Sequence, residues 1–282
     1  MQSKRVSAGF AACLIAASLA SPALADRDAV ARGKSWTLQL DGDARSVQKR
    51  NADVAVVDPD EVRNPTRLRS KPNGDRRAVL AYISVGEAET YRSYMKKGSK
   101  RWLTNREQGW AGNKVVKFWD PEWKEIVKTR VRKAIDAGYD GVYLDRVDTY
   151  ESIKAPRGSS RAEMIKLVEE VASEARRRRS NAAVAVQNAE ELLNDRGYVS
   201  AIDAIGKEDL YHGINHDGRR NNREAVRASE RMLKQAKAQG KGVYVLEYVQ
   251  GETAKSVRSQ AKRAGFAVST TGRRDLRTAS ED

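Results

Sequence analysis

The sequence predicts an α/β fold, a (β/α)8 TIM barrel in which eight parallel strands alternate with helices. Eight short apolar runs recur along the chain, and helical patterns lie between most of them. The length also fits, since removing a predicted 25-residue leader leaves 282 − 25 = 257 residues, close to the roughly 250 of a typical barrel. We therefore expect a single barrel domain.

The first 25 residues are typical of an export signal peptide. Two basic residues precede the uncharged apolar stretch Ala8–Ala20, and residues 23–25 (Ala-Leu-Ala) form a small-x-small cleavage pattern before Asp26. The apolar stretch is too short to span a bilayer stably. The single cysteine, Cys13, lies inside it, which disfavours lipidation there. We expect a periplasmic or extracellular protein without disulfides or stable membrane insertion.

The eight strand candidates are mostly apolar, as expected for parallel strands covered by helices on both faces. They are Trp36–Leu40, Val54–Val57, Ala78–Val85, Gly141–Leu144, Ala183–Val186, Ala201–Ile205, Gly242–Leu246 and Phe266–Ser269. An open, doubly wound sheet is the alternative architecture. No Gly-x-Gly-x-x-Gly motif follows the first strand, so nothing supports a dinucleotide site.

Three segments between these strands have apolar residues spaced for one buried helical face. They are Glu122–Ala137, Ser160–Arg179 and Glu224–Gln239. Ser160 and Glu163 form a plausible capping box at the start of the second helix. A glycine follows the first and third helices, where a left-handed C-terminal cap is expected.

The charge is strongly positive but scattered. The net charge is +15, and removal of two basic residues with the leader gives 51 − 38 = +13. Such an excess is typical of proteins that bind nucleic acid or anionic surfaces. Here the basic residues fall mostly at predicted helix ends and loops, and export argues against a nucleic-acid partner. The barrel domain should cover residues 26–274, and the polar residues 275–282 should form a frayed C-terminal tail.

Polar side chains gather at the carboxyl ends of the predicted strands, which form one rim in a barrel. An isolated Asp145 is better explained as a helix cap or an ion-pair partner, but the repetition of the pattern favours a functional rim. The residues are Gln39, Asp41, Asp58, Tyr82, Ser84, Glu87, Asp145, Asp148, Gln187, Asn188, Glu208, Asp209, Tyr211, Glu247 and Tyr248.

The available side chains restrict the chemistry of this rim. The only histidines, His212 and His216, lie four residues apart, but Gly213 and the turn residues around His216 disfavour the helix that a metal site would need. We expect no metal and no cofactor. Serine triads need a histidine base, and no Gly-x-Ser-x-Gly motif is present. Paired carboxylates with aromatic and amide neighbours remain, which is the equipment of glycoside hydrolysis.

Five sequence blocks resemble the motifs of glycoside hydrolase family 114, a family of endo-α-1,4-polygalactosaminidases and related exported bacterial barrel proteins. The resemblance runs from about Trp36 to Gly272. The blocks are Trp36-Thr-Leu-Gln-Leu-Asp41, Ala81-Tyr-Ile-Ser-Val-Gly-Glu87, Phe118-Trp-Asp-Pro121, Gly138-Tyr-Asp-Gly-Val-Tyr-Leu-Asp145 and Glu208-Asp209-Leu-Tyr211.

The resemblance implies a retaining endo-glycosidase that cleaves an α-1,4-linked galactosamine-containing polysaccharide. It implies a nucleophile at Asp145 and an acid/base at Glu208, with Glu247 as the alternative for the second role. The other rim residues, together with a sugar platform at Trp119, would bind substrate: Asp41, Tyr82, Ser84, Glu87, Trp119, Asp148, Gln187, Asn188, Tyr211, Glu247 and Tyr248.

The positive charge conflicts with this substrate, because a +13 protein attracts a cationic polymer poorly over long range. Either the cleft is locally acidic, or the substrate is acetylated, neutral or different. A non-catalytic carbohydrate-binding or envelope-associated barrel is the alternative function. We expect a monomer whose partner is a polysaccharide.

Overall fold

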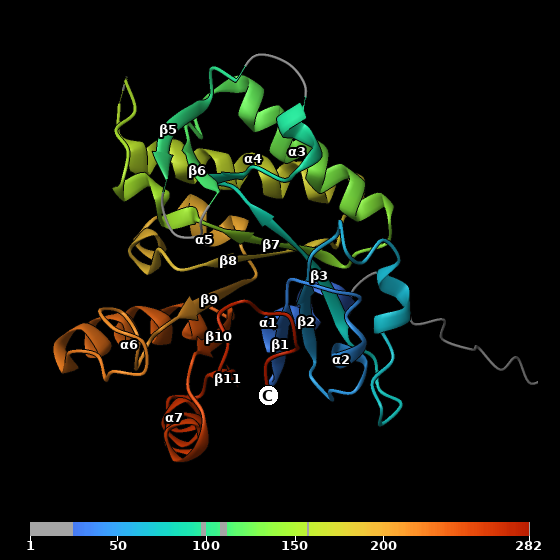
Figure 1. The fold of residues 1–282 in the computed structure, drawn as a ribbon, viewed down its shortest axis with the longest axis vertical. Helices are drawn as coiled ribbons and strands as arrows, with labels where there is room; N and C mark the ends of the chain where they lie inside the picture. The colour runs from blue at the N-terminus through green and yellow to red at the C-terminus, as the bar shows by residue number, and fades with distance from the viewer. Residues whose placement is uncertain (1–24, 97–99, 108–111, 157, 282) are drawn as a thin grey trace, which may run out of the picture.

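The structure, a computed structural model, describes residues 25–281 except 97–99, 108–111 and 157. The predicted leader lies almost wholly outside the described residues. Eight parallel strands form one sheet in the order β1-β2-β3-β7-β8-β9-β10-β11 (Figure 1). Their bounds are β1 (Trp36–Gln39), β2 (Val54–Val57), β3 (Ala78–Ser84), β7 (Gly141–Asp145), β8 (Ala183–Gln187), β9 (Ala204–Glu208), β10 (Gly242–Glu247) and β11 (Ala267–Thr270). The predicted (β/α)8 barrel with all eight strands parallel is confirmed.

The sixth predicted strand is displaced along the chain. Ala201 belongs to helix α5 (Arg196–Ala201), which begins where the Asp195 side chain accepts a 2.9 Å hydrogen bond from the backbone N–H of Tyr198. Strand β9 begins at Ala204 and continues to Glu208. The strand was predicted too early because β9 itself ends in two charged residues, Lys207 and Glu208, which no apolar run includes.

The main helices cover the outside of the barrel. They are α3 (Pro121–Asp136), α4 (Ser160–Arg178), α6 (Arg223–Ala238) and α7 (Gly251–Ala264), with shorter segments α1 (Ala25–Arg32), α2 (Arg45–Gln48), η2 (Pro65–Leu68), η3 (Ser93–Lys96), η4 (Val147–Glu151) and η5 (Glu190–Asn194). Helices α3 and α4 lie side by side outside β7 (Figure 1). Gly138 and Gly240 have φ values of +96° and +79°, which confirms the predicted left-handed caps. Among the described residues, no helix combines the length and the apolar character needed to cross a membrane.

The predicted capping box at Ser160 is wrong. The Ser160 hydroxyl donates to the carbonyl of Ile153 and accepts from the N–H of Ala155, both at 2.8 Å. These two hydrogen bonds hold the loop that precedes α4 against the first turn of the helix. Ser159 occupies the N-cap position without a side-chain hydrogen bond.

A small antiparallel sheet between β3 and α3 was not predicted. It has the order β4-β6-β5, formed by β4 (Glu87–Glu89), β6 (Asn113–Val116) and β5 (Leu103–Glu107). Strand β5 is partly or fully exposed along its length and reads Leu-Thr-Asn-Arg-Glu. Its sequence therefore lacks the apolar run that predicted the barrel strands.

Aromatic side chains fill the inside of the barrel. The Trp36 ring lies 6.1 Å from the Tyr143 ring and 5.5 Å from the Tyr244 ring, measured between centroids. A Cβ atom on Gly206 would lie 2.0 Å from the Tyr143 hydroxyl, so this position needs glycine. Helix α1 closes the amino-terminal end of the barrel, where the carbonyl of Val30 accepts a hydrogen bond from the Tyr244 hydroxyl.

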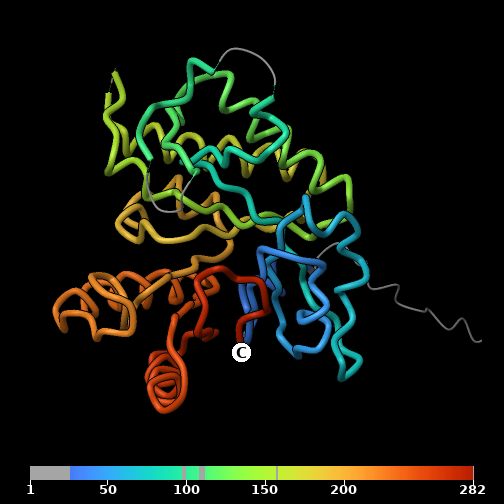
Figure 2. Tube along the Cα trace, in the orientation of Figure 1, coloured from blue at the N-terminus to red at the C-terminus, as the bar shows by residue number. Residues whose placement is uncertain are grey.

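The C-terminal segment joins β11 to β1, so the expectation of a frayed tail is wrong. Thr270 and Glu281 exchange two backbone hydrogen bonds of 2.7 Å, and the N–H of Ser280 donates to the carbonyl of Leu38. The N–H of Leu40 donates to Leu276 in the same way. Figure 2 shows this end of the chain beside the first strand. The segment stays ordered because its backbone pairs on both sides, whatever the polarity of its side chains.

This seam predicts a stability effect at Ser280, which is fully buried. Its hydroxyl accepts the N–H of Leu38 at 3.0 Å, so Ser280→Ala leaves a buried donor unpaired. We expect a loss of about 1–3 kcal/mol in the free energy of unfolding, measured by chemical denaturation. Ser256→Ala, at an exposed position of α7, is the control and should change it by less than about 0.5 kcal/mol. Equal effects would show that the seam contributes no stability.

Candidate active site

Asp145 ends β7, and two donors hold its carboxyl group. Oδ2 accepts a 2.6 Å hydrogen bond from the Tyr82 hydroxyl, and Oδ1 accepts the backbone N–H of Arg146 at 2.6 Å. Tyr82 comes from β3, which pairs with β7 so that Ser84 lies opposite Asp145. The side chain is thus fixed by its own strand end and by a neighbouring strand.

Glu208 ends β9, and residues from three strand ends surround it. The Tyr248 hydroxyl donates to Oε1, and Gln187 Nε2 donates to Oε2 at 3.1 Å. The backbone N–H of Glu208 donates to Asn188 Oδ1 at 3.1 Å. The ends of β8, β9 and β10 therefore converge on this carboxyl group.

The charge of Glu208 reaches Asp145. Burial and the charge of Glu208 raise the pKa of Asp145 to about 7, although the Arg146 guanidinium opposes the rise. Burial also raises the pKa of Glu208, while the hydrogen bond from Tyr248 lowers it. Asp145 and Glu208 are thus two desolvated carboxyl groups at the ends of β7 and β9, of the kind used for acid/base and nucleophilic chemistry.

A second acidic group lies beside Asp145. Glu87 is 1% exposed and pairs with Arg146 at 2.6 Å, while the Ser84 hydroxyl donates to the Glu87 carbonyl at 2.9 Å. Burial raises the pKa of Glu87 to about 7, although Arg146 opposes the rise. Asp148 is close enough for its charge to affect both Glu87 and Asp145. Its buried Oδ1 has no hydrogen-bond partner among the described residues.

Glu247 lies beneath the loop that follows β9 and is fully buried. Its two oxygens accept the backbone N–H groups of Tyr211 at 2.7 Å and His212 at 3.1 Å. Tyr211 is also buried, and its hydroxyl bonds to Glu230. These contacts hold the loop after Glu208 in place. Burial raises the pKa of Glu247 to about 8.

Two of the sequence candidates, Asp41 and Trp119, contact other residues. Asp41 is half exposed and pairs with Arg277 at 2.9 Å. Trp119 is half buried and packs edge-on against Phe118, with 5.0 Å between ring centroids. Within the described residues, no hydrogen bond or ion pair joins either residue to Asp145 or Glu208.

Sequence reasoning missed three residues that contact or influence the pair. Tyr143 points into the barrel, and both Asp145 and Glu208 raise its pKa in addition to the dominant effect of burial. Arg146 follows Asp145 directly, and its left-handed conformation (φ 60°) gave no sequence signal. Arg274 ion-pairs with Asp209, 65 residues earlier in the chain, at 2.9 Å. Its position in a basic dipeptide indicated only a solvated surface.

Neither histidine joins a metal site. His212 Nδ1 lies 3.8 Å from Glu247 Oε2, and burial lowers its pKa. The described part of the chain contains no group of three or more His, Cys, Asp or Glu side chains arranged to hold a metal ion.

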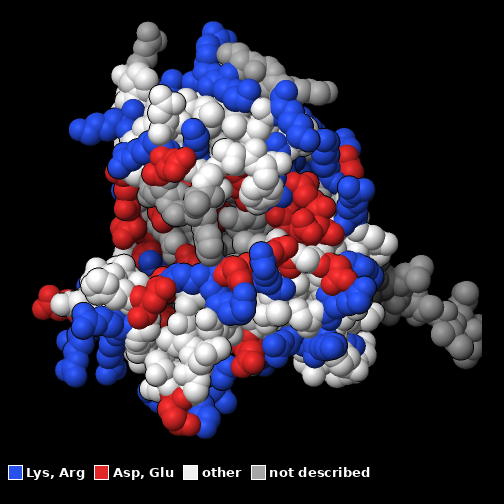
Figure 3. All heavy atoms as spheres, viewed as in Figure 1, with Lys and Arg blue, Asp and Glu red and all other residues white. Residues whose placement is uncertain are grey.

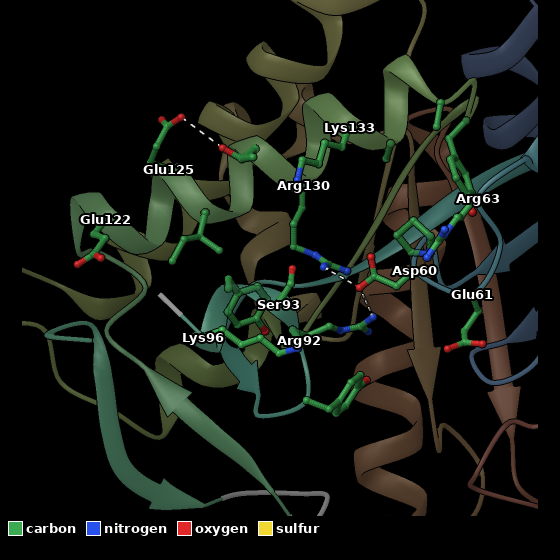
Figure 4. Close-up of a pocket in the computed structure, with 18 residues that line it drawn as sticks. Asp60, Glu61, Arg63, Arg92, Ser93, Lys96, Glu122, Glu125, Arg130 and Lys133 are labelled. Carbon is green, nitrogen blue, oxygen red and sulfur yellow. Dashed lines mark hydrogen bonds and ion pairs between the residues drawn. The ribbon is translucent and has the colours of Figure 1, made fainter. Parts of the chain in front are cut away.

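A groove of about 890 Å³ runs along α3, away from the carboxyl pair (Figure 4). It exists because residues 58–77, between β2 and β3, form only the short η2 turn, so α3 lacks a helical neighbour on that side. Arg92 and Arg130 both pair with Asp60, at 2.7 and 3.1 Å. The lining carries five basic and four acidic side chains, so the groove favours neither sign of charge.

Figure 3 shows how charge is distributed over one face of the molecule. Acidic side chains lie on several sides of the central region of this face, and Lys and Arg side chains lie beside them as well as on the outer parts. Both signs of charge therefore occur around the centre of this face.

Sequence comparison agrees with this geometry. The profile of glycoside hydrolase family GH114 matches residues 17–279. The chain belongs to glycoside hydrolase family GH114. It is thus a glycoside hydrolase. An uncharacterised protein of Deinococcus radiodurans is 34% identical over 264 residues, with 89% of this chain and 83% of that protein covered.

Two solved structures share the fold of this GH114 chain. The glycoside hydrolase domain of PelA from Pseudomonas aeruginosa has a TM-score of 0.71 at 18% identity, covering 87% of this chain and 96% of that one. Ega3 from Aspergillus fumigatus, in complex with galactosamine, has a TM-score of 0.68 at 20% identity, covering 87% and 93%.

The raised pKa values predict how stability depends on pH. Burial raises the pKa of Glu247 from 4.5 to about 8 in the folded protein. The folded state therefore binds more protons than the unfolded state between these two pH values. The free energy of unfolding therefore falls as pH rises across this window, and Glu87 and Asp145 act in the same direction up to about pH 7. Glu247→Gln has no proton to lose, so we expect a flatter slope of thermal midpoint against pH between 5 and 8.

The control for this measurement is Glu252→Gln. Glu252 is exposed on α7, so water solvates its carboxylate in both folded and unfolded states. Its substitution should leave the slope as in the parent. A parent-like slope for Glu247→Gln would contradict the prediction.

Proposed function

We propose that this GH114 glycoside hydrolase is an exported, retaining endo-glycosidase that cleaves α-1,4-linked galactosamine-containing polysaccharide. The observation that carries the proposal is the placement of two buried carboxyl groups, Asp145 and Glu208, at the ends of β7 and β9. Each of the two carboxyl groups ends a barrel strand, and each has its own set of donors. A retaining glycosidase needs two such groups in different roles.

Asp145 is suited to the role of nucleophile. The Tyr82 hydroxyl and the Arg146 N–H stabilise its negative charge, and the Arg146 guanidinium adds a nearby positive charge. In the first step, an Asp145 oxygen attacks the anomeric carbon and the glycosidic C–O bond breaks. A covalent glycosyl-enzyme forms, with the leaving sugar accepting the proton that Glu208 donates.

Glu208 is suited to the role of acid/base because burial favours its protonated form. Once the leaving sugar has departed, the Glu208 carboxylate takes a proton from water, and that water attacks the anomeric carbon. The C–O bond to Asp145 breaks, and Glu208 is protonated again. We assign Gln187, Asn188 and Tyr248 to holding Glu208.

We assign Glu247 and Tyr211 to supporting the loop behind Glu208. Both oxygens of Glu247 already accept backbone N–H groups, so Glu247 is less suited than Glu208 to protonate a leaving group. The sequence left Glu247 open as an alternative acid/base. We assign that role to Glu208 instead.

The substrate class is supported by the acidic surroundings of the pair. Asp148 Oδ1 is a buried acceptor without a partner, and Glu87 lies beside it. These groups suit the ammonium group of an amino sugar, and Tyr82 and Ser84 lie on the same rim. Such local acidic groups would attract an amino sugar despite the net charge of +13 expected for the mature chain. The galactosamine bound in the Ega3 complex is consistent with this class. We also propose that Asp41 and Trp119 bind sugars of the polymer.

The two roles predict different responses to the leaving group. Asp145→Asn should reduce turnover on both polymer and an activated aryl glycoside, by on the order of a thousandfold or more, because the nucleophile is lost. Glu208→Gln should reduce polymer cleavage by about 10²–10⁴-fold but glycosylation by the aryl substrate far less, because a good leaving group needs no proton. Product sizing and pre-steady-state release of the aryl alcohol measure these effects.

The matched control is Glu247→Gln, which changes a buried carboxyl group in the same way. Normal polymer cleavage by Glu208→Gln together with a loss in Glu247→Gln would reverse the acid/base assignment. Parent activity in all three variants would place the site elsewhere. Proton NMR of the first product tests retention, and an inverted anomer would exclude the covalent step.

Export predicts a mature chain that begins at Asp26. Asp26 is fully buried and pairs with Arg76 at 2.7 Å, so the first residue of the mature chain would be anchored. N-terminal sequencing of protein recovered outside the cytoplasm measures the cleavage point. Retention of Met1, or a lipid on Cys13, would contradict the prediction.

A further inference from the structure

Arg274 contacts two groups that flank Glu208. It lies after β11, and its guanidinium carbon is 4.0 Å from the centroid of the Tyr248 ring. Its Nη2 lies 2.9 Å from Asp209 Oδ2 and 2.7 Å from Asp217 Oδ1. One side chain thus stacks on an aromatic face and binds two carboxylates.

Both contacts lead directly to Glu208. Tyr248 donates its hydroxyl hydrogen bond to Glu208, and Asp209 is the next residue in the chain, held in a left-handed conformation with φ 54°. Gly213 leaves the space for this arrangement. A Cβ atom there would lie 2.4 Å from Asp209 Oδ1 and 3.1 Å from Arg274 Nη2.

We propose that Arg274 is a positioning residue for Glu208, acting through Tyr248 and Asp209. This inference rests on the proposed role of Glu208 as the acid/base. A cation over the ring face is attracted by the ring electrons and withdraws density from the phenol, which strengthens the hydroxyl as a donor. The guanidinium also joins two carboxylates, because Nη2 donates to Asp209 while Nε donates to Asp217 at 2.8 Å. The single ammonium group of lysine cannot reproduce this arrangement of two nitrogens.

The charges around Glu208 show why Asp209 needs a counterion. Burial raises the pKa of Glu208, and the charges of Asp209 from the same loop and Asp148 from η4 add to the rise, while the Tyr248 hydrogen bond and the Arg274 charge lower it. Asp145 on β7 is a further carboxyl group nearby, because the charge of Glu208 raises its pKa. Tyr143, also on β7, faces both carboxyl groups. Arg274 is therefore the cation that opposes several anions at this position.

The decisive measurement is the pH dependence of kcat/KM on polymer, whose alkaline limb reports loss of the Glu208 proton. Arg274→Gln should move this limb upward by about one pH unit and reduce kcat at its optimum on the order of tenfold, because the pKa rises and the carboxyl group is held less firmly. Asp209→Asn should move the limb downward. The double variant should lie near the parent, because the charges it removes oppose one another.

Arg273→Gln is the matched control. Arg273 is the adjacent arginine, it is 61% exposed, and it pairs with Asp275 rather than with the site. Its substitution should leave both the limb and kcat unchanged. Arg274→Lys keeps the charge but loses the second nitrogen that joins Asp217 to Asp209, so the limb should stay near that of the parent while kcat falls. If Arg274→Gln does not fold, as judged by circular dichroism, Arg274→Lys and Asp209→Asn decide the proposal.

A second readout needs no substrate. In protein labelled with ¹³C at the glutamate carboxyl group, NMR titration follows Glu208 directly, and the signal missing in Glu208→Gln assigns it. The pKa of Glu208 should rise in Arg274→Gln and fall in Asp209→Asn. Shifts in Arg274→Gln or Asp209→Asn no larger than in Arg273→Gln would overturn the proposal. A parent enzyme that cleaves no galactosamine polymer would overturn the proposed function alone, because the titration still tests Arg274.

Discussion

Burial of carboxyl groups at the mouth of the barrel is the constraint on which the site depends. Asp145, Glu87 and Glu247 each lose most of their hydration, and the cost appears as pKa values raised to between about 7 and 8. Each group persists there because specific donors replace water. The donors come from neighbouring strand ends, so the parallel register of the sheet determines which acids have partners and which keep free oxygens.

This constraint divides the acidic residues by their partners. The oxygens of Glu247 are occupied by backbone N–H groups, so its charge supports a loop. Asp145 and Glu208 instead accept mostly from side chains, whose hydroxyl and amide groups can adjust as charge develops during a reaction. Identical residue types therefore suit different tasks, and the nature of the donor separates them.

The sequence predicted the barrel well because its strands are buried on both faces. Runs such as Val54–Val57 have no other plausible structure between helical segments, and their polar ends indicated Asp145 and Glu208. The sequence did not predict the features that depend on contacts between residues far apart in the chain. Ser280 is polar yet fully buried, β5 is polar yet forms a strand, and Arg274 reaches Asp209 across 65 residues. A single sequence carries no pattern that reports such pairings.

The seam between β11 and β1 also bears on the order in which the chain can fold. The contact of Thr37 with Ser280 joins residues 243 positions apart, and it forms only after the last residues of the described chain have been synthesised. Contacts of such high sequence separation close slowly. A growing chain therefore cannot complete its sheet early. The barrel therefore closes in a late step that depends on the C-terminal segment, whatever the rate at which the individual strands and helices form.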